Sequence, residues 1–453
     1  MDSSKSRVSR SVSLFGMAAL LCLAAIPFAG ASAQGSGPIL AALPPPQPNQ
    51  TSAEYGKAVE FLNGHIIVSA PREDIIGAVH IYDRATLSLA RSLFGQGLDG
   101  YGEFLHNVGL AYGRDRIQDL LLGGPNVQGG LFALKGSSST YLDESSASPL
   151  LEPFQPAQFG YAAAVIGDVN GDGLQDYVVG APSYRVSGDP YQKGAAFVIS
   201  GRTATVLSTI VGTAWFGRFG ESVAAVGDYD GDGKGDVAIG APDTASVGGT
   251  VALYGSSNNF STPLFQFHGI VQSGSIKNER LGTRLVAIDL DCDGVRDLVA
   301  GSYRADVAPF GSPDDGVIRA LRGGDLKNGQ VVEMYAHYGA ENSQLGYRLI
   351  SMPDMNGDRR GDIATVQWTM VGAQAGVSLQ LLNGGNGTEI GSYVLAASPD
   401  STRHVPAIAA GPDLNGDGYA DILLGRPGLN RADLMSGGFL ATQAHDTPMS
   451  ACP

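Results

Sequence analysis

The apolar residues of this chain gather in short runs of about four to eight, separated by Gly, Pro and Asp. Ser222–Gly227 and Asp236–Pro242 are two such runs on either side of an acidic stretch. Tyr177–Pro182 and Asp421–Pro427 follow two further acidic stretches. Short apolar runs closed by turn residues are typical of β-strands. The recurring unit is therefore predicted to be a strand, an acidic loop and a second strand.

Two more strands are predicted in each unit. A third apolar run, bounded by glycine, follows a variable polar loop at residues 194–201, 248–255, 316–324 and 376–385. A fourth, weaker run comes next at residues 203–212 and 263–269. Four strands per unit match one blade of a β-propeller. The 64 glycines of the chain suit this fold, because tight turns between strands need positive φ.

The acidic stretch Asp228–Asp236 has a ligand-like spacing. Aspartates stand at its positions 1, 3, 5 and 9, and Gly233 at position 6 permits a sharp turn. Oxygen atoms at alternate positions of a tight loop can converge on one point. A hard cation with several oxygen ligands, above all Ca²⁺, fits such an array.

The same pattern starts at five aspartates spaced about 60 residues apart, which indicates repeated structural units. We predict about five structural Ca²⁺ sites, each bound by the side chains at positions 1, 3, 5 and 9 and the backbone carbonyl of position 7. The predicted ligands are Asp168, Asn170, Asp172, Leu174 and Asp176; Asp228, Asp230, Asp232, Lys234 and Asp236; Asp289, Asp291, Asp293, Val295 and Asp297; Asp354, Asn356, Asp358, Arg360 and Asp362; and Asp413, Asn415, Asp417, Tyr419 and Asp421.

Acidic loops of this kind also occur in EF-hands and in metal-free turns. An EF-hand closes with Glu at position 12 between two helices, whereas these loops have Val, Ile, Ala, Thr or Leu there and strands on both sides. Metal-free turns rich in Asp, Asn and Gly remain an alternative, although they leave the shared carboxylate at position 9 unexplained. Cys292, at position 4 of its loop, is expected to be a small filler and not a ligand.

Seven units can be counted from Tyr55 onward. The first has no aspartate series, and the second keeps only Asp115 and Asp119 at positions 5 and 9, so we expect it to be metal-free. In the sixth unit Arg359 stands where the other loops have Gly, which leaves metal binding there open.

These residues resemble the FG-GAP repeat of the integrin α-subunit head. The signature is Phe-Gly, an acidic loop and Gly-Ala-Pro, and it appears here as Phe159-Gly160 with Gly180–Pro182 and as Phe219-Gly220 with Gly240–Pro242. The resemblance covers residues 55 to 443. It implies an all-β fold, a seven-bladed β-propeller of four-stranded antiparallel blades, with Ca²⁺ in the loops of the later blades.

The sequence divides into four predicted segments. Residues 1–33 read as a secretory signal peptide, with a basic start, an apolar run and Ala31-Ser32-Ala33; a transmembrane anchor is the alternative. Residues 34–54 form a Pro/Gly-rich lead-in, residues 55–443 the propeller and residues 444–453 a short tail. The last unit runs out after a predicted third strand at Ser436–Gln443, so we expect Pro38–Leu43 to supply its fourth strand and close the ring.

The formal net charge of −15 is accounted for by the acidic loops and argues against nucleic acid or an anionic membrane surface as a partner. No apolar stretch after the signal is long enough for membrane insertion. The expected localisation is secreted and extracellular, or periplasmic or cell-surface if the source is bacterial. The sequence leaves the oligomeric state open.

Two classes of function fit these features. The first is an adhesion or recognition module for an extracellular protein or glycan ligand. Its ligand would meet the loops opposite the acidic ones, which carry Tyr184, Tyr191, Trp215, Tyr303 and Phe310, unless these rings pack between blades. The second is an extracellular hydrolase or lyase acting on a polysaccharide or ester. Because the sequence shows no HExxH, GxSxG or phosphate-loop motif, we predict no enzyme.

The tripeptide Arg360-Gly361-Asp362 is a known adhesion sequence. It lies inside the acidic loop of the sixth unit, with Asp362 at position 9. A carboxylate held by a cation is not free to meet a receptor, so we predict that the tripeptide is coincidental.

Overall fold

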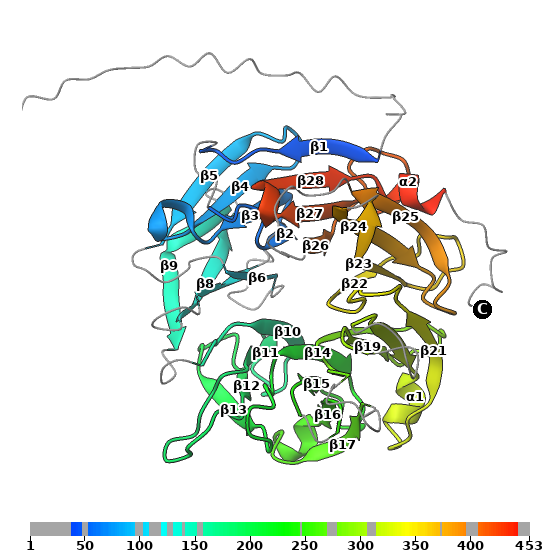
Figure 1. Cartoon of the computed structure of the whole chain (residues 1–453). Coiled ribbons are helices and arrows are strands. Elements are labelled where there is room, and N and C mark those ends of the chain that lie inside the picture. Colours follow the sequence, from blue (N-terminus) through cyan, green and yellow to red (C-terminus); the bar gives the residue numbers. More distant parts are fainter. Residues whose placement is uncertain are drawn as a thin grey trace, which may run out of the picture. The chain divides into compact units, whose positions relative to one another are not determined.

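The predicted repeats fold as four-stranded antiparallel sheets (Figure 1). The computed structural model describes residues 38–47, 53–95, 103–107, 119–124, 130–137, 141–151, 157–244, 247–269, 279–305, 314–371, 374–395 and 406–442. The chain divides into two compact units, Met1–Gln34 and Gly35–Pro453, and every described residue lies in the second. The predicted signal peptide and the tail at 444–453 lie outside the described residues.

Seven sheets are present among these residues, each a run of four antiparallel strands. In chain order they contain β2 (Val59–Leu62), β3 (His65–Ala70), β4 (Ala78–Asp83) and β5 (Leu89–Phe94); β6 (Phe104–Asn107), β7 (Leu120–Gly124), β8 (Gly130–Ser137) and β9 (Tyr141–Leu151); β10 (Ala162–Gly167), β11 (Asp176–Ala181), β12 (Ala195–Ile199) and β13 (Val206–Val211); β14 (Ser222–Gly227), β15 (Asp236–Ala241), β16 (Thr250–Tyr254) and β17 (Pro263–His268); β18 (Arg284–Ile288), β19 (Asp297–Ser302), β20 (Val317–Leu321) and β21 (Glu333–Tyr338); β22 (Arg348–Met352), β23 (Asp362–Val371), β24 (Gln374–Leu382) and β25 (Glu389–Leu395); and β26 (Ala407–Ala410), β27 (Ile422–Arg426), β28 (Arg431–Met435) and β1 (Ile39–Leu43).

In the part of the chain that the structure describes, helices are few and short. The α-helices are α1 (Gly323–Leu326) and α2 (Gly437–Ala441), and the 3₁₀ turns are η1 (Glu73–Ile75), η2 (Ser256–Asn258) and η3 (Pro427–Leu429).

The first strand of each sheet is the innermost. These strands contact one another in the order β2, β6, β10, β14, β18, β22 and β26, and β26 contacts β2. The molecule is thus a β-propeller built from four-stranded antiparallel blades, as predicted.

The second strands explain why the sequence shows solid apolar runs and not alternation. All six residues of β15 are buried, as are all six of β11 and of β19. A blade lies between two others, so its middle strands are covered on both faces and neither face can be polar. The outer strand β13, in contrast, includes exposed residues.

Glycines at the blade boundaries explain the Phe-Gly and Gly-Ala-Pro signatures. A Cβ on Gly180 would lie 2.0 Å from the carbonyl oxygen of Gly220 in the next blade. Gly220 itself has φ of +87°, and Phe219 beside it lies edge-on to Tyr254 at 6.0 Å. Backbones of adjacent blades meet here too closely for any side chain. Phe fills the space beside the contact.

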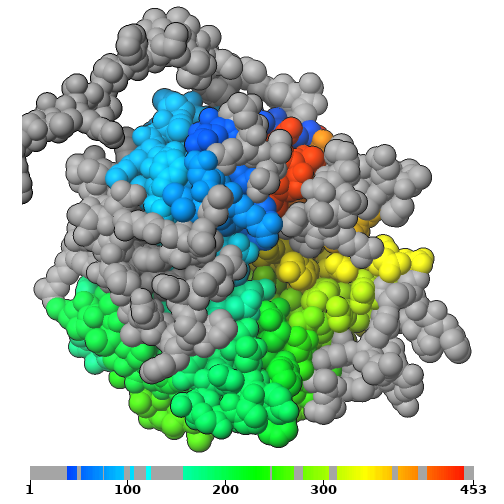
Figure 2. All heavy atoms as spheres, turned by 60° about the vertical axis from the view of Figure 1, so that its left-hand side comes forward, coloured from blue at the N-terminus to red at the C-terminus, as the bar shows by residue number. Residues whose placement is uncertain are grey.

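Strand β1 completes the sheet formed by β26, β27 and β28. It pairs antiparallel with β28, with Leu43 opposite Ala432, and Leu43 is buried in the core cluster that includes Leu434. In both overall views the blue N-terminal residues lie beside the red C-terminal ones (Figures 1 and 2). The pairing expected for Pro38–Leu43 is therefore present.

The third strand of this last sheet corrects a prediction. It is β28, Arg431–Met435, and the segment predicted as the strand, Ser436–Gln443, begins with helix α2. Ser436 caps that helix by accepting a hydrogen bond from the Phe439 N–H. A Cβ on Gly437 would lie 1.9 Å from the Ala420 carbonyl oxygen, so this glycine is needed for close packing and does not mark a strand boundary.

Cys292 also differs from expectation. It is disulfide-bonded, so it is not a free thiol acting as a small filler.

Candidate metal centres

All five acidic loops connect the first strand of a blade to its second and lie at the same end of the strands. Position 9 opens the second strand in four of them, as Asp176, Asp236, Asp297 and Asp362, and immediately precedes β27 as Asp421. These five aspartates are buried, with at most 1% of each exposed. The last residue of each loop is thus anchored in the core of its blade.

Backbone N–H groups hold the position 9 carboxylate from two sides. In the fourth blade, Asp236 Oδ2 accepts from Tyr229 N at 2.7 Å and Asp230 N at 3.0 Å, while Oδ1 accepts from Ser256 N at 2.8 Å. The other four loops repeat this arrangement, with donors from position 2 and from the turn after the third strand: Val169 and Gly201 to Asp176, Leu290 and Gly323 to Asp297, Met355 and Gly384 to Asp362, and Leu414 and Gly437 to Asp421.

The position 1 carboxylate shapes the loop itself. Asp228 Oδ1 accepts from Gly231 N at 2.6 Å, and Oδ2 accepts from Gly233 N at 2.9 Å. Both glycines are left-handed, with φ of +81° and +85°. In two other loops Cys292 (φ +67°) and Arg359 (φ +65°) adopt the same conformation without being glycine. The sixth-blade loop therefore keeps the common fold in spite of Arg359.

Among the described residues, two loops bring three carboxylates together. One oxygen each of Asp228, Asp230 and Asp236 lies within 4.8 Å of the others, and a second group contains Asp289, Asp291 and Asp297. Three like charges at this distance repel unless a cation lies between them. In the other three loops position 3 is Asn170, Asn356 or Asn415, so an amide replaces the third carboxylate.

Burial makes the position 9 carboxylates costly to ionise. It raises the pKa of Asp236, Asp297 and Asp421 to about 6 and that of Asp362 to about 7, with neighbouring carboxylates adding to the effect. The pKa of Asp176 is raised for the same reason. A divalent cation favours the charged form of such groups.

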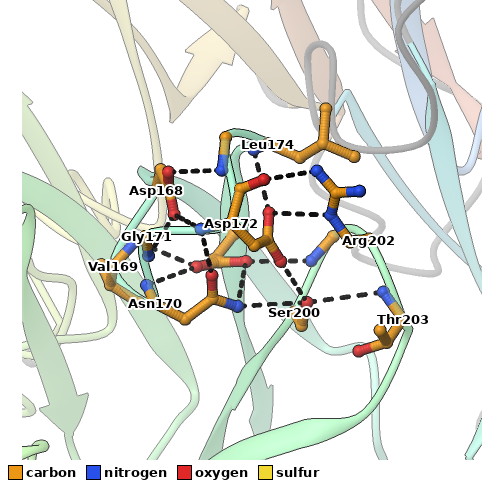
Figure 3. A network of polar contacts seen from close by, with 12 residues as sticks. Asp168, Val169, Asn170, Gly171, Asp172, Leu174, Ser200, Arg202 and Thr203 are labelled. Carbon is orange, nitrogen blue, oxygen red and sulfur yellow. Dashed lines mark hydrogen bonds and ion pairs between the residues drawn. The ribbon is translucent and has the colours of Figure 1, made fainter.

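The aspartates at position 5, Asp232 and Asp293, do not belong to the two clusters of three carboxylates. Asp232 Oδ1 accepts from Lys234 N at 2.8 Å, and Oδ2 accepts from the Ser256 hydroxyl at 2.7 Å. In the third blade, the corresponding Asp172 accepts from Ser200 and pairs with Arg202 (Figure 3). The participation of position 5, and of the position 7 carbonyls, in metal binding stays a prediction.

Several partners of the loops were missed from the sequence. They follow the third strand of each blade and donate side-chain hydrogen bonds to loop carboxylates: Ser200 to Asp172, Ser256 to Asp232, Ser257 to Asp230, Asn383 to Asp358 and Ser436 to Asp417. The only sequence signal is a Ser, Asn or Gly directly after the third strand. It cannot be interpreted without knowing that this turn meets the loop.

Neighbouring loops are also joined to one another. Lys234 Nζ donates to the Val169 carbonyl of the preceding blade at 2.7 Å, and Arg360 Nη1 donates to the Leu290 carbonyl at 3.0 Å. Lys234 and Arg360 both stand at position 7 of their loops, and the carbonyl groups that accept from them belong to residues at position 2. The Tyr229 hydroxyl donates to the Arg296 carbonyl of the fifth blade, so the loops of the third to sixth blades form a linked series.

The Arg360-Gly361-Asp362 tripeptide is held within this structure. Asp362 is fully buried and accepts hydrogen bonds from Met355 N and Gly384 N. A Cβ on Gly361 would lie 2.1 Å from Ile288. As predicted, the tripeptide is not presented to a receptor.

The opposite ends of the strands carry exposed aromatic rings. Tyr191, Trp215 and Phe216 are 44%, 58% and 57% exposed, and Tyr191 contacts the other two rings at 5.3 and 5.1 Å. We call these three residues the aromatic patch. Tyr184 and Tyr303 instead pack inward, against Phe197 and Tyr347 respectively. For these two rings the alternative expectation, that they pack within the propeller and do not meet a ligand, therefore holds. Phe310 lies outside the described residues.

Together these features define a β-propeller with acidic, metal-competent loops between the first two strands of its later blades. Comparison with known proteins agrees with this description. Residues 159–199, 219–254 and 404–437 match the FG-GAP repeat. Integrin alpha-4 of Xenopus laevis is 27% identical over 277 residues, which cover 57% of this chain and 25% of that protein.

Two further relatives give the same result. Integrin alpha-IIb of Mus musculus is 33% identical over 221 residues, covering 46% of this chain and 20% of that protein. Integrin alpha-8 of Gallus gallus is 34% identical over 156 residues, covering 32% and 15%. The chain thus matches a quarter or less of the length of each relative. It carries FG-GAP repeats and is distantly homologous to integrin alpha subunits over their N-terminal propeller region.

No helix within the described ranges combines the length and apolar character needed to cross a membrane.

Proposed function

We propose that this chain is a secreted, calcium-stabilised recognition module that binds an extracellular protein or glycan through the aromatic patch. In this proposal residues 1–33 are removed on export, the sheet β6–β9 is the second of seven blades in one closed ring, and residues 55–443 with β1 form the propeller. The acidic loops have a structural role, and the opposite ends of the strands meet the ligand.

The donor set of the loops supports Ca²⁺ as the metal. The side chains at positions 1, 3 and 9 are carboxylates or amides, which are hard oxygen ligands of the kind that Ca²⁺ prefers. A bound ion would supply positive charge between carboxylates that otherwise repel, most directly at Asp228, Asp230 and Asp236. We propose five such sites. Extracellular modules of this kind often bind Ca²⁺ at roughly 10⁻⁴–10⁻³ M.

The aromatic patch is the observation that supports recognition. Three large rings exposed side by side are an unusual use of apolar surface in a soluble protein. Their positions are fixed, because Phe216 N donates to the Gln192 carbonyl at 2.6 Å and so ties the two loops together. Rigid aromatic rings on loops suit the faces of sugar rings and the hot spots of protein interfaces.

Binding to glycan and extracellular-protein arrays, in calcium, tests the proposal. The wild-type chain is compared with Trp215→Ala and Tyr191→Ala, and with Val331→Ala as a matched exposed apolar control. We expect hits that both aromatic variants lose and the control keeps. Hits that survive in both aromatic variants, or no hit on either array, would contradict the patch as the ligand site.

One arrangement of side chains, around His80, bears on the hydrolase alternative. His80 lies between Ser92 Oγ, 2.8 Å from Nδ1, and Glu73 Oε2, 2.7 Å from Nε2. This order of atoms is that of a nucleophile, a base and an orienting acid. However, His80 and Glu73 are at most 1% exposed, and Tyr55 packs beside the histidine ring at 5.7 Å. We therefore interpret the three residues as a buried polar network of the first blade.

A further inference from the structure

Two arginines, Arg284 and Arg348, occupy equivalent places in adjacent blades. Each is the first residue of its innermost strand, β18 or β22, at the end opposite the acidic loops. Both side chains are half-buried. This position places them where the inner strands of the propeller come together.

Among the described residues, Arg284 and Arg348 lack the carboxylate partner that other half-buried arginines have. No carboxylate among the described residues forms an ion pair within 4.0 Å with Arg284 or Arg348. Arg284 Nη1 donates to the adjacent Thr283 carbonyl at 3.0 Å, whereas Arg348 Nε is buried and has no hydrogen-bond partner among the described residues. Other half-buried arginines are paired: Arg280 with Asp243 at 2.7 Å, Arg319 with Glu279 at 3.1 Å and Arg426 with Asp433 at 3.3 Å.

Tyrosine rings surround the two guanidinium groups. Arg284 lies over Tyr347 at 5.7 Å, and Arg348 lies over the same ring at 5.5 Å. Arg284 also lies over Tyr161, at 5.9 Å, although Tyr161 belongs to the third blade and a whole blade separates β10 from β18. The contact therefore reaches past the intervening fourth blade. We call Tyr161, Arg284, Tyr347 and Arg348 the axial cluster.

No acid among the described residues balances the positive charge of the axial cluster. Burial and the like charge of Arg284 lower the pKa of Arg348. Tyr347, Tyr161 and Glu103 act on the pKa of Arg348 in the opposite direction, but the Glu103 carboxylate is already paired with Lys57 at 3.3 Å. The stacking on tyrosine offsets only part of the cost of holding two cations together away from water. In a chain of net charge −15, this excess is unexpected unless an anion completes it.

We propose that the axial cluster is a binding site for a carboxylate group, which enters the end of the ring opposite the acidic loops and is held by Arg284 and Arg348. A planar carboxylate can accept paired N–H bonds from a planar guanidinium, and the two tyrosine rings can cover its carbon skeleton. The source is either a small free dicarboxylate or an acidic side chain of a polypeptide. This site is separate from the aromatic patch, and the inference does not depend on the proposed recognition function.

Calorimetric titration of the full chain in calcium-containing buffer tests the site, with sodium glutarate as the free dicarboxylate and N-acetyl-aspartate amide as the side-chain analogue. We expect saturable binding of one molecule per chain. Arg284→Met and Arg348→Met, which keep the apolar stem, should each weaken it at least tenfold. Arg202→Met, which changes a half-exposed arginine beside the acidic loop of the third blade, should bind like wild type. Tighter binding of glutarate or of the aspartate analogue identifies the source.

A thermal melt without added carboxylate separates a ligand site from a structural role. Because the charge of Arg348 is uncompensated, Arg348→Met should melt at the wild-type temperature or above it, whereas Arg280→Met, which breaks the pair with Asp243, should melt lower. A marked drop for Arg348→Met would show that the arginine serves the fold. Absence of saturable binding, binding that persists in both Met variants, or a preference for sodium sulfate over both carboxylates would overturn the proposal.

Discussion

The carboxylate of Asp236 accepts a hydrogen bond from the backbone N–H of Ser256 at 2.8 Å, and so joins an acidic loop to the turn beyond the third strand of the same blade. Its other oxygen accepts from Tyr229 N and Asp230 N within the loop. One side chain thus fixes the loop on both sides while also contributing an oxygen to the group with Asp228 and Asp230. The geometry of the loop and that of the proposed metal site therefore depend on the same residue.

Asp236→Asn should be more damaging than a change at the neighbouring Asp232. An amide cannot accept from all three N–H donors at once, and each buried donor left without an acceptor costs about 1–3 kcal/mol. Asp232 is exposed and lies outside the three-carboxylate group, so Asp232→Asn should cost less. Urea denaturation of both variants in excess calcium measures the difference. Equal losses would show that position 9 has no special anchoring role.

Removal of calcium should loosen the later blades. Without a cation, the carboxylates of Asp289, Asp291 and Asp297 repel within 4.8 Å, as do those of the fourth blade. A site at 100-fold excess of free metal over its Kd contributes about 2.7 kcal/mol, so five sites would make the stability strongly calcium-dependent. Melting curves in EGTA, and after calcium is added back, check this. Superimposable curves would count against a structural metal.

The sequence was sufficient for those features that depend on local order. Aspartates at fixed spacing, with glycine at position 6, predict a loop because every oxygen and turn lies within nine residues. The strand at Ser222–Gly227 follows from its own apolar run and matches β14. The β-propeller architecture then follows from the repetition of the unit.

The remaining features arise from contacts between distant segments. Ser256 and Gly437 meet acidic loops only because the third strand returns to the same end of the blade, and their sequence neighbourhoods do not reveal it. The segment at Ser436–Gln443 resembles other third strands in composition, yet its glycines serve the packing of α2 against the loop. Arg284 and Arg348 are 64 residues apart and become neighbours only through the ring.

Strand β1 should be essential to the fold although it precedes the repeats. Deletion of residues 34–50 would leave β28 as an unpaired edge and remove Leu43 from the core cluster, which promotes unfolding and edge-to-edge association. We expect a much lower melting temperature and aggregation in light scattering. Leu43→Ala should cost roughly 2–5 kcal/mol, while the exposed Ala42→Ser should be nearly neutral. An unchanged melt after the deletion would refute ring closure by β1.

The links between neighbouring loops should contribute measurably to stability. Lys234 Nζ reaches the Val169 carbonyl at 2.7 Å and Arg360 Nη1 reaches the Leu290 carbonyl at 3.0 Å, so each joins one blade to the blade before it. Hydrogen bonds of this kind, from a charged donor to a carbonyl, are worth about 1.5–3 kcal/mol when well shielded and less when exposed. Because Lys234 is exposed and Arg360 half-buried, Arg360→Ala should be the more destabilising in urea unfolding. Lys327→Ala, an exposed change outside the loops, is the matched control and should have little effect. If all three variants unfold at the wild-type urea concentration, the loops act independently and the linked series has no energetic role.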